Sequence, residues 1–181
     1  SPQDAAMITI PDDDEPLVIL DDEAVLSPAM QEYLRASGIT NPATWAAFRL
    51  DQAGDAVMER LLRPSQSHGR TGIWLPTFDP RDPVTIVGLI RLTPAQHHHR
   101  FVTAPMGLAG DPALAHERRI ILCDSPIQAM RLHQRGVIGV AVVDDPAVLP
   151  PLLDWLRDRD LVVAGFRETN RARIIAALGP L

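Results

Sequence analysis

Acidic residues follow three apolar segments in the last third of the chain. They are Asp124 after residues 120–123, Asp144 and Asp145 after 139–143, and Glu168 two positions beyond Phe166. If the apolar segments are neighbouring parallel strands, their carboxyl ends share one edge of a sheet, where open α/β sheets bind ligands. Grouped carboxylates are the ligands that hard cations such as Mg²⁺ prefer. The spacing therefore indicates a metal site in which Asp124, Asp144 and Glu168 are the candidate ligands.

The same acids also have ordinary structural interpretations. Ser125-Pro126-Ile127-Gln128 fits a helix capping box, so Asp124 is not needed as the cap. Asp145-Pro146 is a common turn pair, and acids near helix starts interact favourably with the helix dipole. Spacing alone leaves both interpretations open.

A strand and helix alternation surrounds these acids from Arg119 onward. Near-continuous apolar strands separated by helices predict a parallel sheet covered on both faces. The expected strands are 120–123, 139–143 and 161–166, and the expected helices are about 126–135, 150–159 and 170–178.

The preceding part of the chain predicts a mixed α+β lobe. Helices are expected from Pro28, from Asn41-Pro42 and over 55–62, because each segment has helix-start residues or apolar residues at helical spacing. Two extended runs around Asp-Pro-Arg-Asp-Pro predict a hairpin over 72–92. A further strand is expected within 97–105, and 106–117 has the composition of a loop. We expect Trp45, Trp74 and Trp155 to be buried anchors.

Composition divides the chain into three expected parts: an acidic linker or tail at 1–24, the mixed lobe at 25–118 and the α/β domain at 119–181. Residues 11–24 contain seven acids and no base, and the chain starts at Ser1, so we expect a piece of a longer protein. No apolar run approaches the ~20 residues of a membrane span. The single cysteine, Cys123, lies in an apolar strand and indicates a buried residue in an intracellular, cytoplasmic protein.

The charge pattern limits the partners. The net charge of -6 argues against a surface coated with positive charge. However, the chain has no lysine, and all 17 of its Lys and Arg residues are arginine, whose planar guanidinium suits phosphate groups. A local basic groove therefore stays compatible with the composition.

Four segments in continuous order resemble the catalytic core of bacterial-type DNA primases, a mixed lobe followed by a Toprim domain. They are "YLRASGITNPATWAAFRLD", "GRTGIWLPTFDPRDPVTIVGLIRL", "RFVTAP" and "RIILCDSPIQAMRLHQRGVIGVAVV". The resemblance extends from about Ser27 to Leu178. It implies an α/β fold in which a Toprim-type parallel sheet is flanked by helices.

The resemblance also implies where catalysis would occur, and the chain departs from the family there. The family has a catalytic Glu before Gly where this chain has Asp124-Ser125, so Asp124 is the candidate catalytic residue. The family's metal-binding Asp-x-Asp matches Phe166-Arg167-Glu168, and its Gly-Thr turn matches Asp144-Asp145. Phenylalanine cannot bind Mg²⁺ and a neighbouring arginine repels it. We therefore expect a degenerate site without tightly bound Mg²⁺.

Family positions that are basic implicate Arg70, Arg91 and Arg100 in binding nucleic acid. Arg70 matches the Gly-Arg before the hairpin, Arg91 a basic position after its second strand, and Arg100 the opening of a Lys-Tyr-Leu-Asn-Ser-Pro segment. Such contacts with phosphates would depend on salt and little on base sequence. His133, in the middle of an expected helix, is interpreted as a surface or groove residue.

Three functions follow as expectations. The first is a degenerate primase core from a larger DNA replication or mobile-element protein, which binds single-stranded DNA or RNA, or other subunits of a replication complex. The second is an active, divergent Mg²⁺-dependent primase or Toprim nuclease that uses Asp124, Asp144 and Glu168. The third is a module that binds only protein.

Overall fold

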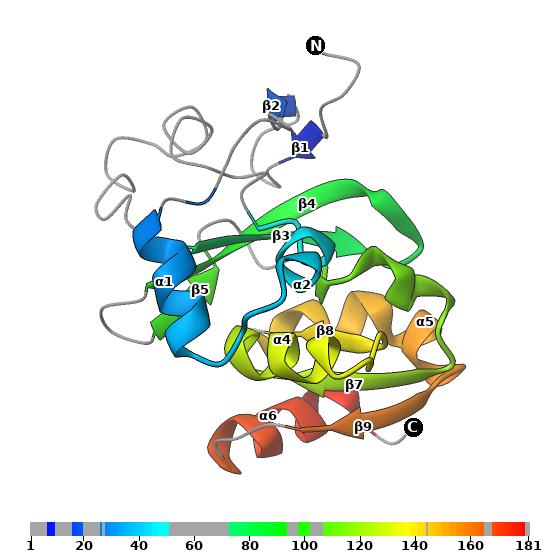
Figure 1. Cartoon of the computed structure of the whole chain (residues 1–181). Coiled ribbons are helices and arrows are strands. Elements are labelled where there is room, and N and C mark those ends of the chain that lie inside the picture. Colours follow the sequence, from blue (N-terminus) through cyan, green and yellow to red (C-terminus); the bar gives the residue numbers. More distant parts are fainter. Residues whose placement is uncertain are drawn as a thin grey trace.

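The structure is a computed structural model that describes residues 7–9, 16–19, 26, 28–50, 73–93, 98–101, 107–143, 145–164 and 168–179. These segments form two β-sheets flanked by helices (Figure 1). The second sheet contains parallel strands, so the predicted mixed α/β class is confirmed. The expected helix at 55–62 lies outside the described residues.

A long hairpin is the centre of the first sheet. Strands β3 (Ile73–Asp79) and β4 (Asp82–Thr93) pair antiparallel, as the two extended runs predict. Strand β5 (His98–Phe101) pairs antiparallel with the end of β4. Two short strands complete the sheet: β1 (Met7–Thr9) lies parallel to β4, and β2 (Pro16–Ile19) pairs antiparallel with β1.

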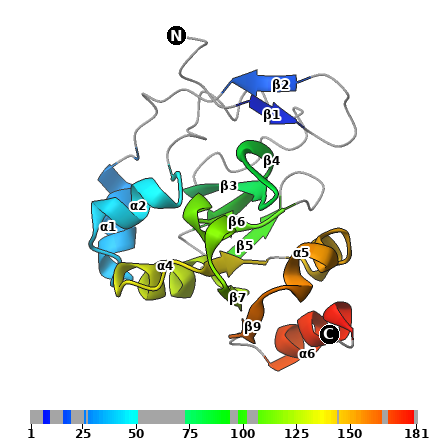
Figure 2. The same ribbon diagram turned by 90° about the vertical axis from the view of Figure 1, so that its right-hand side faces the viewer.

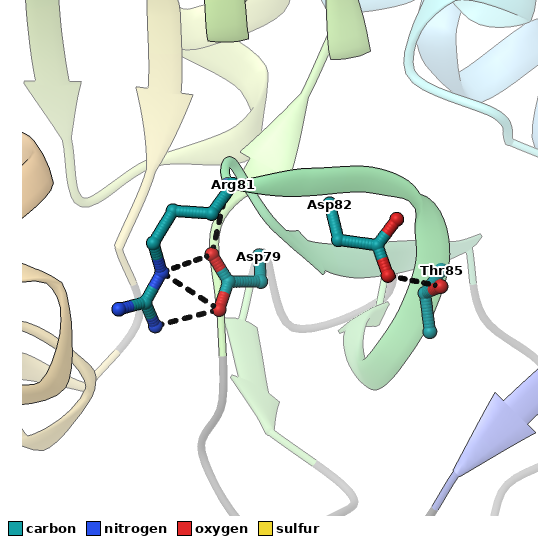
Figure 3. Close-up of polar contacts among 4 residues, drawn as sticks. All are labelled: Asp79, Arg81, Asp82 and Thr85. Atoms are coloured by element: carbon teal, nitrogen blue, oxygen red, sulfur yellow. Dashed lines mark hydrogen bonds and ion pairs between the residues drawn. The ribbon is translucent and has the colours of Figure 1, made fainter.

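Acidic side chains stabilise the turn of this hairpin (Figure 3). The Asp79 carboxylate accepts hydrogen bonds from the backbone N–H of Arg81 at 2.9 Å and from its guanidinium Nη2 at 2.7 Å. The Asp82 carboxylate accepts one from the Thr85 hydroxyl at 2.7 Å. Both contacts are local, as expected where aspartate and proline are turn residues.

The second sheet has the order β6-β8-β7-β9. Its three parallel strands are β7 (Arg119–Cys123), β8 (Val140–Val142) and β9 (Asp160–Val163), and β6 (Ala109–Gly110) pairs antiparallel with β8. Helix α4 (Pro126–Gln134) connects β7 to β8, and α6 (Glu168–Leu178) follows β9. The 3₁₀ segments η5 (Pro146–Val148) and η6 (Pro150–Leu152) precede α5 (Leu153–Arg157) between β8 and β9.

Alternate residues of β7 belong to two different cores. Ile120 and Leu122 pack in a cluster with Trp155, on the side where α5 and α6 lie (Figure 2). Cys123 packs in a second cluster on the opposite side, with residues of α4 and of the first two helices, α1 (Pro28–Ala36) and α2 (Pro42–Ala47). The second cluster therefore joins the mixed lobe to the α/β domain. All three tryptophans are buried, as predicted.

The two sheets meet at Phe78 and Leu108. Their backbones exchange two hydrogen bonds, of 2.9 and 2.8 Å, so the end of β3 lies beside the segment that leads into β6. Gly107 has φ +73°, and a Cβ at this position would overlap the carbonyl of Phe78. Glycine meets both demands, the left-handed backbone and the close approach.

Two predictions about boundaries need correction. Segment 106–117 was expected to be a loop, but it contains β6 and a 3₁₀ helix, η4 (Pro112–His116), capped by Asp111. The second sheet thus includes residues before 119. In addition, β9 ends at Val163 instead of Phe166, and Glu168 is the first residue of α6.

Candidate functional site at the carboxyl edge of the second sheet

Asp124 lies at the carboxyl end of β7, between the strand and the first turn of α4. The hydroxyl of Ser125 accepts a hydrogen bond of 3.4 Å from the backbone N–H of Gln128, and Pro126 occupies the first helical position. Ser125 is therefore the cap that the sequence predicts, and the Asp124 carboxylate is available for other contacts. Nevertheless, Asp124 is only 5% exposed.

The Asp124 carboxylate contacts α6, the helix that follows strand β9. Its Oδ2 accepts a hydrogen bond from Nδ2 of Asn170, in the first turn of α6, at 3.0 Å. Parallel strands bring these residues together from positions 46 apart in the chain. The edge of the sheet thus joins an acid to an amide, a contact that the pattern of acidic residues does not indicate.

Glu168 and Asp145 do not join this pair. Glu168 is exposed and lies two residues from Asn170, and side chains two apart on a helix point in different directions. Asp145 caps η5, because its carboxylate accepts a hydrogen bond of 2.9 Å from the backbone N–H of Ala147. This is the turn interpretation of Asp145. Asp144 lies outside the described residues.

The donors described at this edge do not fit Mg²⁺. This ion requires close to octahedral coordination by oxygen, usually from carboxylates and water. In the described ranges, no three His, Cys, Asp or Glu side chains lie close enough together to hold a metal ion. The amide nitrogen of Asn170 has no lone pair to offer a cation, so an ion bound at Oδ2 of Asp124 would have to displace this contact or turn the amide oxygen toward itself.

Cys123 does not add a nucleophile to the edge. Burial of the thiol, reinforced by the nearby charge of Asp124, raises the pKa of Cys123 to about 12. The thiol is therefore protonated at neutral pH, and only the thiolate is reactive. Cys123 is a fully buried residue of the core, as the sequence predicts.

The three predicted nucleic-acid residues lie in different surroundings. Arg91 is only 7% exposed, and its guanidinium carbon lies 5.7 Å from the centre of the Trp74 ring. Little of it is accessible to a phosphate in solution. Arg100, in β5, is opposite Arg91 in the sheet register, and Arg70 lies outside the described residues.

His133 connects the two lobes, so its interpretation as a surface or groove residue is wrong. Its side chain is 13% exposed, with Nδ1 3.0 Å from the Thr44 hydroxyl and Nε2 3.1 Å from the Asp111 carboxylate. The ring also packs edge-on against Phe48 at 5.4 Å. Thr44 is 1% exposed, and the three side chains come from both lobes, so we interpret this Thr-His-Asp arrangement as a structural contact.

Arg49, just after α2, connects that helix to the β3–β4 hairpin within the mixed lobe. Its guanidinium donates a hydrogen bond of 2.6 Å to the carbonyl of Pro83 and lies 5.5 Å from the centre of the Phe78 ring. Burial lowers the pKa of Arg49, and the charge of Asp111 opposes that shift. Its φ of +56° directs the chain out of α2 in the left-handed conformation.

Comparison with known proteins supports a family likeness at the level of fold. No protein-family model matches the chain, and no curated protein matches it significantly. A solved structure of the DnaG primase catalytic domain bound to ssDNA matches it with a TM-score of 0.57 and 13% sequence identity.

The fold is primase-like. The match covers 83% of this chain, and this chain spans 59% of the length of the DnaG domain. At 13% identity the likeness concerns the fold alone. Among the described residues, no helix has the length and apolar character to cross a membrane.

Proposed function

We propose that this chain is a primase-type core that binds single-stranded nucleic acid, or a replication partner, without synthesising primer. It would work in the cytoplasm as part of a larger DNA replication or mobile-element protein. The observation that carries the binding role is the fold match over most of the chain to a primase domain bound to ssDNA. The observation against synthesis is the hydrogen bond between Asp124 and Asn170.

The proposed groove depends mainly on Arg70 and Arg100. Arg100 belongs to the edge of the first sheet, and Arg70 shortly precedes β3 in the chain. Arg91 remains a proposed contact, although its burial suits a role in packing against Trp74. Because the whole chain is acidic, binding would require such a local cluster of arginines.

Fluorescence anisotropy of a labelled single-stranded oligonucleotide across a salt series tests the binding role. Each phosphate contact contributes about 0.7 to the slope of log K against log salt for single strands. The variant Arg70→Ala with Arg100→Ala should therefore lower the slope by about 1.4 and weaken binding at low salt. The variant Arg171→Ala with Arg173→Ala removes the same charge from exposed positions on α6 and should leave the slope unchanged.

An unchanged slope in the Arg70 and Arg100 variant would reject the groove. If the wild-type chain failed to bind at low salt, the nucleic-acid role would fall and the protein-binding function would remain. Arg91→Ala is measured separately, with thermal unfolding as its folding control.

A primer-synthesis assay separates the proposal from the active-enzyme alternative. The purified chain is incubated with a single-stranded template, nucleotides and Mg²⁺ or Mn²⁺. We expect no template-directed product. A product that disappears in Asp124→Ala would establish a divergent, active primase.

A further inference from the structure

The buried carboxyl group of Asp124 needs compensation from its surroundings. At 5% exposure it has lost most of its hydration, and a buried carboxylate is stable only beside hydrogen-bond donors or a cation. In the family that the chain resembles, the corresponding edge holds divalent metal. Here no three described His, Cys, Asp or Glu side chains lie close enough together to hold such an ion.

Asn170 supplies a donor at this position. Its Nδ2 lies 3.0 Å from Oδ2 of Asp124, which is a normal length for an N–H···O bond. Amide nitrogen and oxygen are assigned from the hydrogen bonds they make, and a carboxylate partner requires the N–H side to face it. The contact also ties the first turn of α6 to the end of β7.

We infer that the Asn170 amide takes the place of a divalent cation beside Asp124, and that this pair fastens α6 to the second sheet. Asparagine differs from aspartate only in having an NH₂ group in place of one carboxylate oxygen. Asn170→Asp would therefore place two carboxylates face to face and make the contact depend on a cation. The inference goes beyond the proposed function, because it assigns a role to Asn170 that does not involve nucleic acid.

Thermal unfolding with and without millimolar Mg²⁺ or Mn²⁺ tests this role. The melting temperature of the wild-type chain should respond to either cation no more than to NaCl of equal ionic strength. Asn170→Asp should lower the melting temperature by about 5 °C, because two carboxylates would then face each other about 3 Å apart. Mg²⁺ or Mn²⁺, but not NaCl, should restore most of that loss.

The double variant Asp124→Asn with Asn170→Asp is the matched control. It exchanges the donor and acceptor and keeps one acid and one amide. We expect it to recover the wild-type melting temperature without any cation and to show no specific response to Mg²⁺ or Mn²⁺.

Two results would overturn the inference. One is a specific stabilisation of the wild-type chain by Mg²⁺ or Mn²⁺, which would mean that the amide gives way to a cation. The other is a double variant as unstable as Asn170→Asp. The first is measured on the wild-type chain alone, so it does not depend on whether Asn170→Asp folds. Neither result changes the oligonucleotide binding that tests the proposed function.

Discussion

Asp79 and Asp124 each lie at the end of a strand, but their surroundings differ. Asp79 is at the hairpin turn, partly open to solvent, where Arg81 donates hydrogen bonds to it (Figure 3). Those hydrogen bonds lower the pKa of Asp79, and the charge of Arg81 lowers it further. Asp124 is buried and bonded to a neutral amide. Asp79 thus forms an ion pair within the hairpin turn, whereas Asp124 helps to join strand β7 to helix α6.

The lowered pKa of Asp79 predicts how the stability of the hairpin depends on pH. A carboxylate with a lowered folded-state pKa stabilises the fold above its unfolded pKa, near 3.8, and loses that contribution as the pH falls through the folded value. Asp79→Asn should therefore be less stable than the wild-type chain at pH 7, with a difference that narrows below about pH 4. Urea unfolding of both proteins from pH 2 to pH 7 measures this difference.

Arg81→Ala provides the control for this prediction. Without the guanidinium, Asp79→Asn should change the pH dependence less, because only the backbone N–H of residue 81 then still lowers the pKa of Asp79. A difference between the wild-type chain and Asp79→Asn that stays constant down to pH 2 would contradict the assigned role of Arg81.

Residue type predicted the role of some candidate site residues but not of others. The Asp145-Pro146 pair predicted a turn, and Asp145 does cap the segment after β8. The sequence does not point to Asn170, because a single asparagine near a helix start has no distinctive spacing and its contact with Asp124 depends on the packing of α6. The burial of Arg91 is likewise a property of the folded sheet, which its position in the sequence does not reveal.

At the scale of elements, three segments from both lobes meet at His133. Helix α2 contributes Thr44, Asp111 caps η4, and α4 carries the histidine between them. Three further contacts join α4 to the loop after α1. Arg131 Nε donates to the carbonyl of Ser37 at 2.8 Å, Gln134 donates to that of Gly38, and the Gln134 side-chain oxygen accepts from the backbone N–H of Thr40 at 3.2 Å. These contacts fasten the mixed lobe to the α/β domain.

Thr44→Val tests the strength of this junction. Valine keeps the shape of threonine but leaves Nδ1 of His133 without its Thr44 partner, which should lower the free energy of unfolding by about 1–2 kcal/mol. The control is Thr40→Val, at an exposed position shortly before α2. It should change the free energy of unfolding by less than about 0.5 kcal/mol. Equal effects in urea unfolding would show that the contact with His133 contributes nothing.

Elements with strong local patterns could be predicted from the sequence. Helix α4 is an example, because its apolar preceding strand, Ser-Pro start and Gly136 end all occur within one short segment. Strand β6 could not be predicted, since two residues have no periodicity and its place depends on pairing with β8. The junction at His133 joins residues 89 and 22 positions apart, so no local pattern indicates it.

At the scale of the whole molecule, a shared core makes the two lobes one unit. Leu34 and Phe48 from the mixed lobe pack in the same cluster as Met130 and Val142 from the α/β domain. The bridge between Phe78 and Leu108 adds a backbone connection between the sheets. Separation of the lobes would expose this core to water.

The shared core predicts one cooperative unfolding transition. The variant Trp155→Phe keeps fluorescence from Trp45 and Trp74 in the mixed lobe, whereas Trp45→Phe with Trp74→Phe keeps Trp155 in the α/β domain. Within each variant, the urea midpoints from fluorescence and from far-UV circular dichroism should coincide. Separate midpoints would mean that the lobes unfold independently.

Our central proposal is that the Asn170 amide closes the acidic edge of this primase-like fold. A crystal of the chain soaked in MnCl₂ and measured at the manganese absorption edge tests it most directly. We expect no anomalous peak at Asp124 and an Asn170 amide still within hydrogen-bond distance of the carboxylate. Manganese bound at Asp124, with the amide displaced, would contradict the claim.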